Sequence, residues 1–211
     1  NGTLAATAAQ GNPAGPTGDL KIGLCSTQSQ SYRYWDGLID EVAIWNDALT
    51  ADEITALYNS GNGLDASSNS GNYSSSSNLQ GYWKFNEGSG TTLTDQTSNG
   101  NNGTISGATW STDVPQPTNT HSLSFDGSDD YVDIPNVNSL TDFSYLGWFK
   151  TVGINQNNAS QIIINTRNGM VRRLTTNMER SWAMKFGGRN GTCPAYGLSG
   201  SPVVNQDQWH H

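Results

Sequence analysis

The alternation of apolar and polar positions predicts short β-strands along most of the chain. The alternation is clean at Gly81–Glu87, with Trp83 and Phe85 on one face, and apolar residues also alternate at Phe143–Lys150 and Ser181–Phe186. Successive side chains of a strand point to opposite faces, so each of these strands is expected to bury one face. Clusters of Gly, Asn, Asp and Ser separate the strands. The pattern is typical of an antiparallel β-sandwich.

The stretch Trp35–Tyr58 predicts a strand followed by a short helix. Leu38–Trp45 is rich in β-formers and is bounded by the turn signals Asp36-Gly37 and Asn46-Asp47. Simple alternation places Leu38, Asp40, Val42 and Ile44 on one face and Ile39, Glu41, Ala43 and Trp45 on the other. Both faces are partly apolar, so the strand is expected to be covered on both sides, with two carboxylates that need partners.

The helix is predicted over residues 51–59. Thr50 and Glu53 form a capping-box pattern, in which the Thr50 hydroxyl caps the N3 amide and Glu53 reaches back. Gly61 is expected to end the helix. An apolar stripe at helical spacing is formed by Ile54, Leu57 and Tyr58.

Composition narrows the class of protein. The chain has 211 residues, 24 Gly and only 13% charged residues, so good helix formers are scarce. The net charge is −8 and no basic cluster exceeds Arg172-Arg173, which argues against nucleic acid or anionic membranes as partners. No apolar run has the length of a transmembrane helix, so we expect no membrane insertion.

A low-complexity stretch divides the chain. Residues 63–78 are rich in Ser, Asn and Gly, and they predict a linker between residues 1–62 and residues 79–211.

The motifs together resemble the laminin-G-like, concanavalin A-like lectin/glucanase superfamily, and most closely the LamG-like jelly-roll domains of large secreted bacterial proteins. Trp35–Tyr58 matches the ending of such a domain, with Trp35 where the family usually has Phe. Segments resembling its opening and middle are Gly81–Gly90, Asp95–Gly103, Leu123–Val132, Phe143–Lys150 and Trp209–His211. The resemblance implies an all-β jelly-roll sandwich with one short helix.

The order of the motifs departs from the family, because the ending precedes the opening. Residues 1–62 resemble the C-terminal part of one sandwich, and residues 79–211 the N-terminal and central part of a sandwich. Neither part is expected to close alone. The parts could belong to separate tandem domains, could combine within one chain, or could complement each other between neighbouring copies and build a fibre.

The loop after residue 94 offers oxygen ligands of the kind that Ca²⁺ takes. We expect a structural Ca²⁺ site at Asp95, Asn99 and Asn102, and the resemblance would bring Asp40 to it. Asp126, Asp129 and Asp130 form a second acidic turn. The alternative for both turns is that the residues only shape the backbone.

Aromatic residues near loops are candidates for stacking on sugars, although core or loop packing is the alternative for each. These candidates are Tyr32, Tyr34, Trp35, Trp110 and Tyr196. Cys25 and Cys193 are expected to form a disulfide, with two unpaired buried thiols as the alternative.

The sequence does not predict an enzyme. Retaining glycosidases need two carboxylates on one face, and simple alternation points Asp40 and Glu41 to opposite faces. We therefore expect a non-catalytic, secreted lectin-like module of a repetitive bacterial protein, structural or adhesive, with other copies of itself and glycans as partners. The alternative is a carbohydrate-binding module of a larger glycoside-active enzyme.

Overall fold

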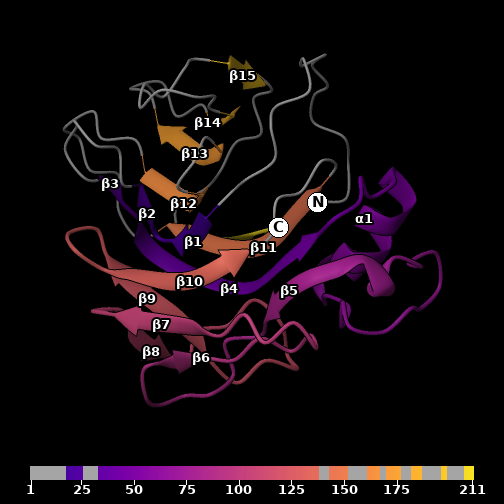
Figure 1. Cartoon of the computed structure of the whole chain (residues 1–211), viewed down its shortest axis with the longest axis horizontal. Helices are drawn as coiled ribbons and strands as arrows, with labels where there is room; N and C mark the ends of the chain where they lie inside the picture. The colour runs from indigo at the N-terminus through magenta and orange to yellow at the C-terminus, as the bar shows by residue number, and fades with distance from the viewer. Residues whose placement is uncertain are drawn as a thin grey trace.

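A computed structural model describes residues 18–25, 33–137, 143–151, 161–166, 170–176, 182–186, 196–198 and 207–211. These residues form two antiparallel sheets and one short α-helix, which confirms the predicted β-sandwich (Figure 1). Among the described residues, no helix has both the length and the apolar character that crossing a bilayer requires.

The larger sheet has eight strands, in the order β15-β14-β13-β12-β1-β10-β7-β6. Their bounds are β1 Gly18–Ile22, β6 Thr92–Leu93, β7 Gly103–Ser106, β10 Tyr131–Val137, β12 Gln161–Thr166, β13 Met170–Thr176, β14 Trp182–Phe186 and β15 Tyr196–Leu198. Strand β1 comes from residues 1–62, and it pairs with β10 on one side and with β12 on the other. A strand of the N-terminal part of the chain therefore lies inside this sheet.

The second sheet has six strands, in the order β16-β11-β4-β9-β8, with β5 also paired to β4. Their bounds are β4 Asp36–Trp45, β5 Leu79–Trp83, β8 Thr109–Ser111, β9 Ser122–Asp126, β11 Ser144–Thr151 and β16 Trp209–His210. A separate two-stranded sheet joins β2 Leu24–Cys25 and β3 Arg33–Tyr34. The helical segments are α1 Ala51–Tyr58 and two 3₁₀ turns, η1 Asn59–Gly61 and η2 Ser76–Asn78.

Strand β4 is the centre of the second sheet. Along one edge it pairs with β11; along the other edge its first half pairs with β9 and its second half with β5. Every strand that pairs with β4 lies after residue 78 in the chain. The structure therefore closes one sandwich within the chain, and β4 supplies its central strand (Figure 1).

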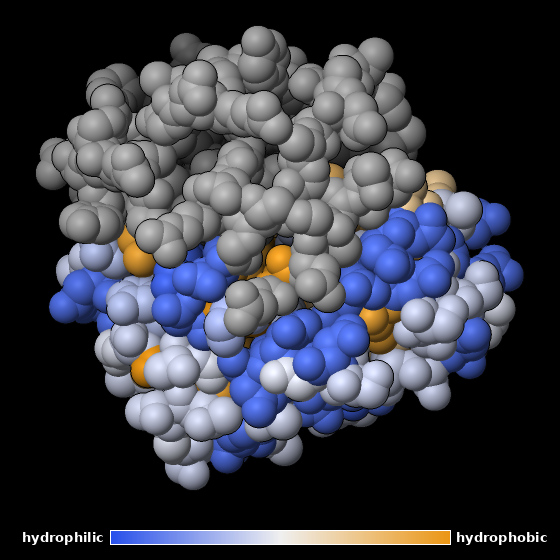
Figure 2. Space-filling view, viewed as in Figure 1, coloured by the Kyte–Doolittle hydropathy of each residue, from blue (hydrophilic) through white to orange (hydrophobic). Residues whose placement is uncertain are grey.

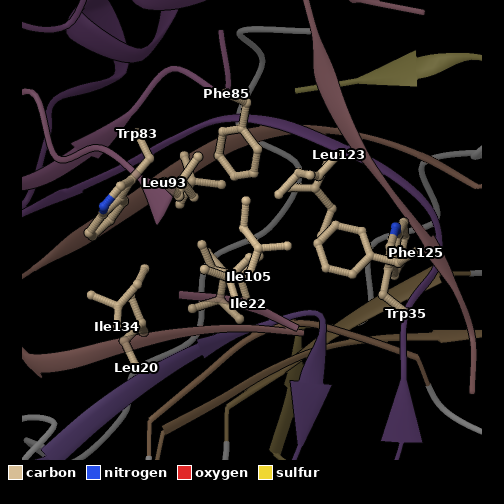
Figure 3. Packing of buried hydrophobic residues seen from close by; sticks show 14 of the residues in the cluster. Leu20, Ile22, Trp35, Trp83, Phe85, Leu93, Ile105, Leu123, Phe125 and Ile134 are labelled. Atoms are coloured by element: carbon tan, nitrogen blue, oxygen red, sulfur yellow. The ribbon is translucent and has the colours of Figure 1, made fainter. Parts of the chain in front are cut away.

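The main core fills the space between the two sheets. One side is lined by residues of the larger sheet, such as Leu20 and Ile134, and the other by residues such as Ile39 and Phe125. Figure 3 shows labelled members of this core, among them Leu20, Ile134 and Phe125, with Trp83 and Trp35 on opposite sides of the group. Trp83 is fully buried, as its alternating strand predicted.

A second cluster covers the outer face of the second sheet. Ala43 and Trp45 of β4 pack there with Leu57 of α1. Together the two clusters confirm that β4 is covered on both faces.

Helix α1 has the predicted capping box, with the Thr50 hydroxyl accepting from the Glu53 amide. The prediction for its end was wrong. Asn59, with a φ of 46°, adopts the left-handed conformation and caps the helix, so it ends two residues before Gly61.

Residues 63–78 join the two parts, but they pack as a structural segment rather than as a free spacer. Tyr73 is 1% exposed; its hydroxyl accepts from the Trp45 indole at 2.9 Å and donates to the Ala66 carbonyl at 2.7 Å. Glu53 accepts hydrogen bonds from the side chains of Ser74 and Ser75 at 3.2 and 2.6 Å. A low apolar content hid this docking, because one aromatic ring and several hydroxyls provide it.

Candidate functional site

A β-bulge on β4 sets the direction of two carboxylates. The register runs from Asp40 opposite Trp148 to Ala43 opposite Leu146, so β4 has one residue more than β11 in this interval. Glu41 occupies the bulge with a φ of 52°. Ile39 and Val42, which flank Asp40 and Glu41 in the strand, both point into the main core.

The bulge overturns the prediction that Asp40 and Glu41 point to opposite faces. Glu41 contacts the second cluster through Tyr82, whose hydroxyl donates to Glu41 Oε2. Asp40 is 0% exposed, and its Oδ2 accepts from the Asn119 amide at 2.7 Å. Asn119 also lies close enough to Glu41 to lower the pKa of its carboxyl group. The two carboxyl groups therefore lie side by side, next to the same amide.

Burial disfavours the charged form of both acids. It raises the pKa of Asp40 to about 9, against the opposing effect of the Asn119 hydrogen bond, and Glu41 adds a like charge. Burial also raises the pKa of Glu41 to about 7, although the Tyr82 hydroxyl and the charge of Lys84 oppose the shift. The pair is therefore expected to hold at least one proton at neutral pH.

A small cavity adjoins the pair. It measures about 20 Å³, which is room for about one water molecule, and is walled in part by Glu41, Tyr82, Trp148 and His211. Tyr58, at the end of α1, stacks on Trp148 with ring centroids 5.8 Å apart. Burial lowers the pKa of His211 to about 3, so its imidazole is uncharged at neutral pH. The arrangement suits proton sharing, but it leaves no space for a sugar ring.

The predicted calcium loop is held together by its own hydrogen bonds. Asp95 Oδ1 accepts from the amides of Tyr82 and Thr97, and Oδ2 accepts from the Thr97 hydroxyl and the Asn101 amide, all at 2.8–3.0 Å. The Asn102 side-chain oxygen accepts from the Asp95 amide at 2.9 Å. With both carboxylate oxygens engaged in this way, the residues present do not fit a Ca²⁺ site in this conformation.

The other predicted calcium ligands, Asn99 and Asp40, form hydrogen bonds with other groups. Asn99 donates its side-chain amide to the Gln80 carbonyl at 3.2 Å. Asp40 accepts from Asn119 and from the Glu41 amide, so it shares no hydrogen-bonding partner with Asp95 among the described residues. The structure therefore gives Asp95 and Asp40 separate roles.

The second acidic turn gathers its three carboxylates. One oxygen each of Asp126, Asp129 and Asp130 lie within 4.8 Å of one another, and two of the three residues are exposed. Asp130 Oδ2 accepts from the Asp126 amide at 2.8 Å, and Asp126 Oδ1 accepts from the Ser128 amide at 2.8 Å. These bonds shape the turn between β9 and β10.

The aromatic candidates for sugar stacking have different outcomes. Trp35 is 0% exposed and belongs to the main core, so the structure overturns its assignment as a stacking surface. Tyr34 is half-buried on β3. Tyr32 and the side chain of Tyr196 lie outside the described residues, as does Cys193, so the predicted Cys25–Cys193 disulfide stays a prediction.

Trp110 is the candidate with the most favourable setting. It lies half-buried on β8, an edge strand, and its indole donates to the Gly90 carbonyl at 3.0 Å. Its ring meets His121 edge-on, with ring centroids 6.4 Å apart. Asn86 accepts hydrogen bonds from the amides of Thr120 and His121 at 2.7 and 3.3 Å. We call this surface, formed by Asn86, Trp110, Thr120 and His121, the Trp110 patch.

Sequence reasoning missed Asn119 and Tyr82 as partners of the carboxylate pair. Tyr82 adjoins Trp83 in a motif whose apolar positions drew attention to the core. Asn119 follows a Pro- and Thr-rich turn with no periodicity. Neither residue can be paired with Asp40 without knowing the bulge.

Comparison with known proteins supports the fold assignment. Residues 1–55 match the family model described as the concanavalin A-like lectin/glucanases superfamily. This match confirms the family resemblance over residues 1–55, a segment that includes β4. No curated protein matches the chain, and no solved structure does.

Proposed function

We propose that this chain is a non-catalytic, lectin-like module of a secreted repetitive protein, with a structural or adhesive role. The observation that carries the proposal is the position of β4, hydrogen-bonded along both edges by strands of residues 79–151. It makes one closed sandwich of the type that lectin-like domains use. The proposal of a non-catalytic role is supported by the cavity beside Glu41, which has room for about one water molecule.

Glycan recognition is assigned to the Trp110 patch. Sugar binding combines an aromatic face with fixed polar partners, and the patch offers Trp110 beside the hydrogen-bonded Asn86 and His121. The described part of the surface in Figure 2 is largely hydrophilic, which suits a polar ligand.

A glycan array followed by calorimetry tests this assignment. We expect Trp110→Ala to weaken binding of any glycan that the wild type retains by about fivefold or more, because a stacked aromatic residue contributes roughly 1 kcal/mol or more. Trp209→Ala is the matched control, since it removes a half-buried tryptophan from the opposite edge strand, β16. Equal losses for both variants, or release of sugar from the glycans, would contradict the proposal.

Assembly between copies is a second candidate function. The observation that favours it is that β4 comes from one part of the chain and all its partners from the other, so the same contacts can form between neighbours. Docking of residues 63–78 onto α1 favours closure within one chain. Secretion follows the usual setting of LamG-like domains and the Ser-, Thr- and Asn-rich composition.

A further inference from the structure

The Asp40–Glu41 pair lies where the two parts of the chain meet. Both acids are on β4, which belongs to residues 1–62. The side chains that hydrogen-bond to them are Tyr82 and Asn119, which belong to residues 79–211. Any change in the charge of the pair therefore acts on the contact between the closing strand and the rest of the sandwich.

No cation neutralises the pair among the described residues. Lys84 is close enough to act on Glu41, but its ammonium is paired with Asp65 at 2.6 Å. Asp65 itself adds a like charge near Glu41. His211, on the cavity wall, is held neutral by burial. Tyr82 donates a hydrogen bond to Glu41 and carries no charge.

We propose that Asp40 and Glu41 form a pH-sensitive latch, which holds β4 in the sandwich while the pair keeps a proton and loosens β4 when both carboxyl groups ionise. Two adjacent carboxylates in a desolvated site repel each other, and in the described part of the chain neither forms an ion pair that would offset the cost. Opening of β4 relieves the repulsion by returning both groups to water.

The sign of the dependence follows from linkage. The pKa values of both acids are raised in the folded state, from 3.8 to about 9 for Asp40 and from 4.5 to about 7 for Glu41. The folded state therefore binds more protons than the open state, and the stabilisation is complete below about pH 4. It declines as pH rises and is lost above the folded pKa values.

Hydrogen exchange read by mass spectrometry tests the latch. The amides of residues 42–45 and 79–83, which pair β4 with β5, report opening directly. After correction for the intrinsic pH dependence of exchange, we expect the opening equilibrium to rise by at least about tenfold between pH 5 and pH 9. Tenfold corresponds to a single unit of pKa shift.

The double variant Asp40→Asn/Glu41→Gln distinguishes the pH dependence caused by this pair from that caused by the other acids of the protein. It keeps the size of both side chains but cannot ionise, so its profile is expected to be flat. Asp52→Asn, which removes an exposed carboxylate from α1, should keep the wild-type profile. If the double variant fails to fold, Glu41→Gln alone should roughly halve the slope of the profile between pH 5 and pH 7, because Asp40 still contributes to it.

Three results would overturn the latch. The first is a wild-type profile without the tenfold rise. The second is an unchanged slope in the variant that lacks the acids. The third is that 1 mM Ca²⁺ removes the increase in opening of the wild type at pH 9. This concentration is on the order of the affinity of extracellular calcium modules, and the result would show that the pair is a cation site.

Discussion

The carboxylate of Glu53 links helix α1 to residues 63–78. Its Oε2 accepts from the amide and hydroxyl of Thr50, both at 3.0 Å. Its Oε1 accepts from the amide and hydroxyl of Ser74 and from the hydroxyl of Ser75 at 2.6–3.3 Å. Burial raises the pKa of Glu53, but these hydrogen bonds outweigh it and lower the pKa to about 2.

Glu53→Gln should destabilise the protein by about 1–3 kcal/mol in urea unfolding at pH 7, because it loses hydrogen bonds to a charged acceptor. The wild type should lose this stabilisation as pH falls from about 4.5 toward 2, since its folded pKa is depressed. The variant should lack that acid-dependent loss. Asp52→Asn, in the same helical turn but exposed, should change stability little. Equal effects of the two variants would refute the role of Glu53.

At the scale of elements, the bulge in β4 decides the chemistry of the strand. Alternation alone predicted that the strand would be covered on both faces, and this was correct. Alternation could not reveal the extra residue, because a bulge arises from pairing with β11 and leaves no periodic signal in β4 itself. The same limit applies to residues 63–78, whose docking depends on Tyr73 and on hydroxyl donors.

Features that depend on neighbouring residues in the sequence were predicted more reliably than features that depend on the tertiary fold. The capping box of α1 follows from Thr50 and Glu53 alone, so the sequence predicted it correctly. The burial of Trp35 depends on the fold around it, and the sequence assigned this residue to a loop surface.

The loop at Asp95 carries a prediction at the element scale. Asp95→Asn replaces one carboxylate oxygen by a donor, so it should lose the hydrogen bonds to that oxygen and lower stability by roughly 1–3 kcal/mol. Thermal unfolding should show the same loss in EDTA and in Ca²⁺. A loss that occurs only when Ca²⁺ is present would show that Asp95 binds the ion, as the sequence suggested. Asp129→Asn, in the exposed acidic turn, is the control.

At the scale of the whole molecule, the order of the motifs matters less than the pairing of the strands. The segment that resembles the ending of a sandwich, β4, pairs directly with the segment that resembles its opening, β5. In this arrangement residues 46–78 form the connection between two neighbouring strands, and α1 with residues 63–78 covers the outer face. One chain can therefore complete its own sandwich although its motifs are in reversed order.

A cross-strand disulfide tests this closure most directly. Asp36 on β4 and Asp126 on β9 are direct partners, and neither is buried, so cysteines at both positions can oxidise readily. The measurement uses Asp36→Cys/Asp126→Cys in a chain with Cys25→Ser and Cys193→Ser, oxidised across a range of concentrations and analysed by non-reducing electrophoresis. Closure within one chain predicts a cross-linked monomer at every concentration. A ladder of covalent oligomers would show that β4 completes the sandwich of a neighbouring copy and would contradict the account.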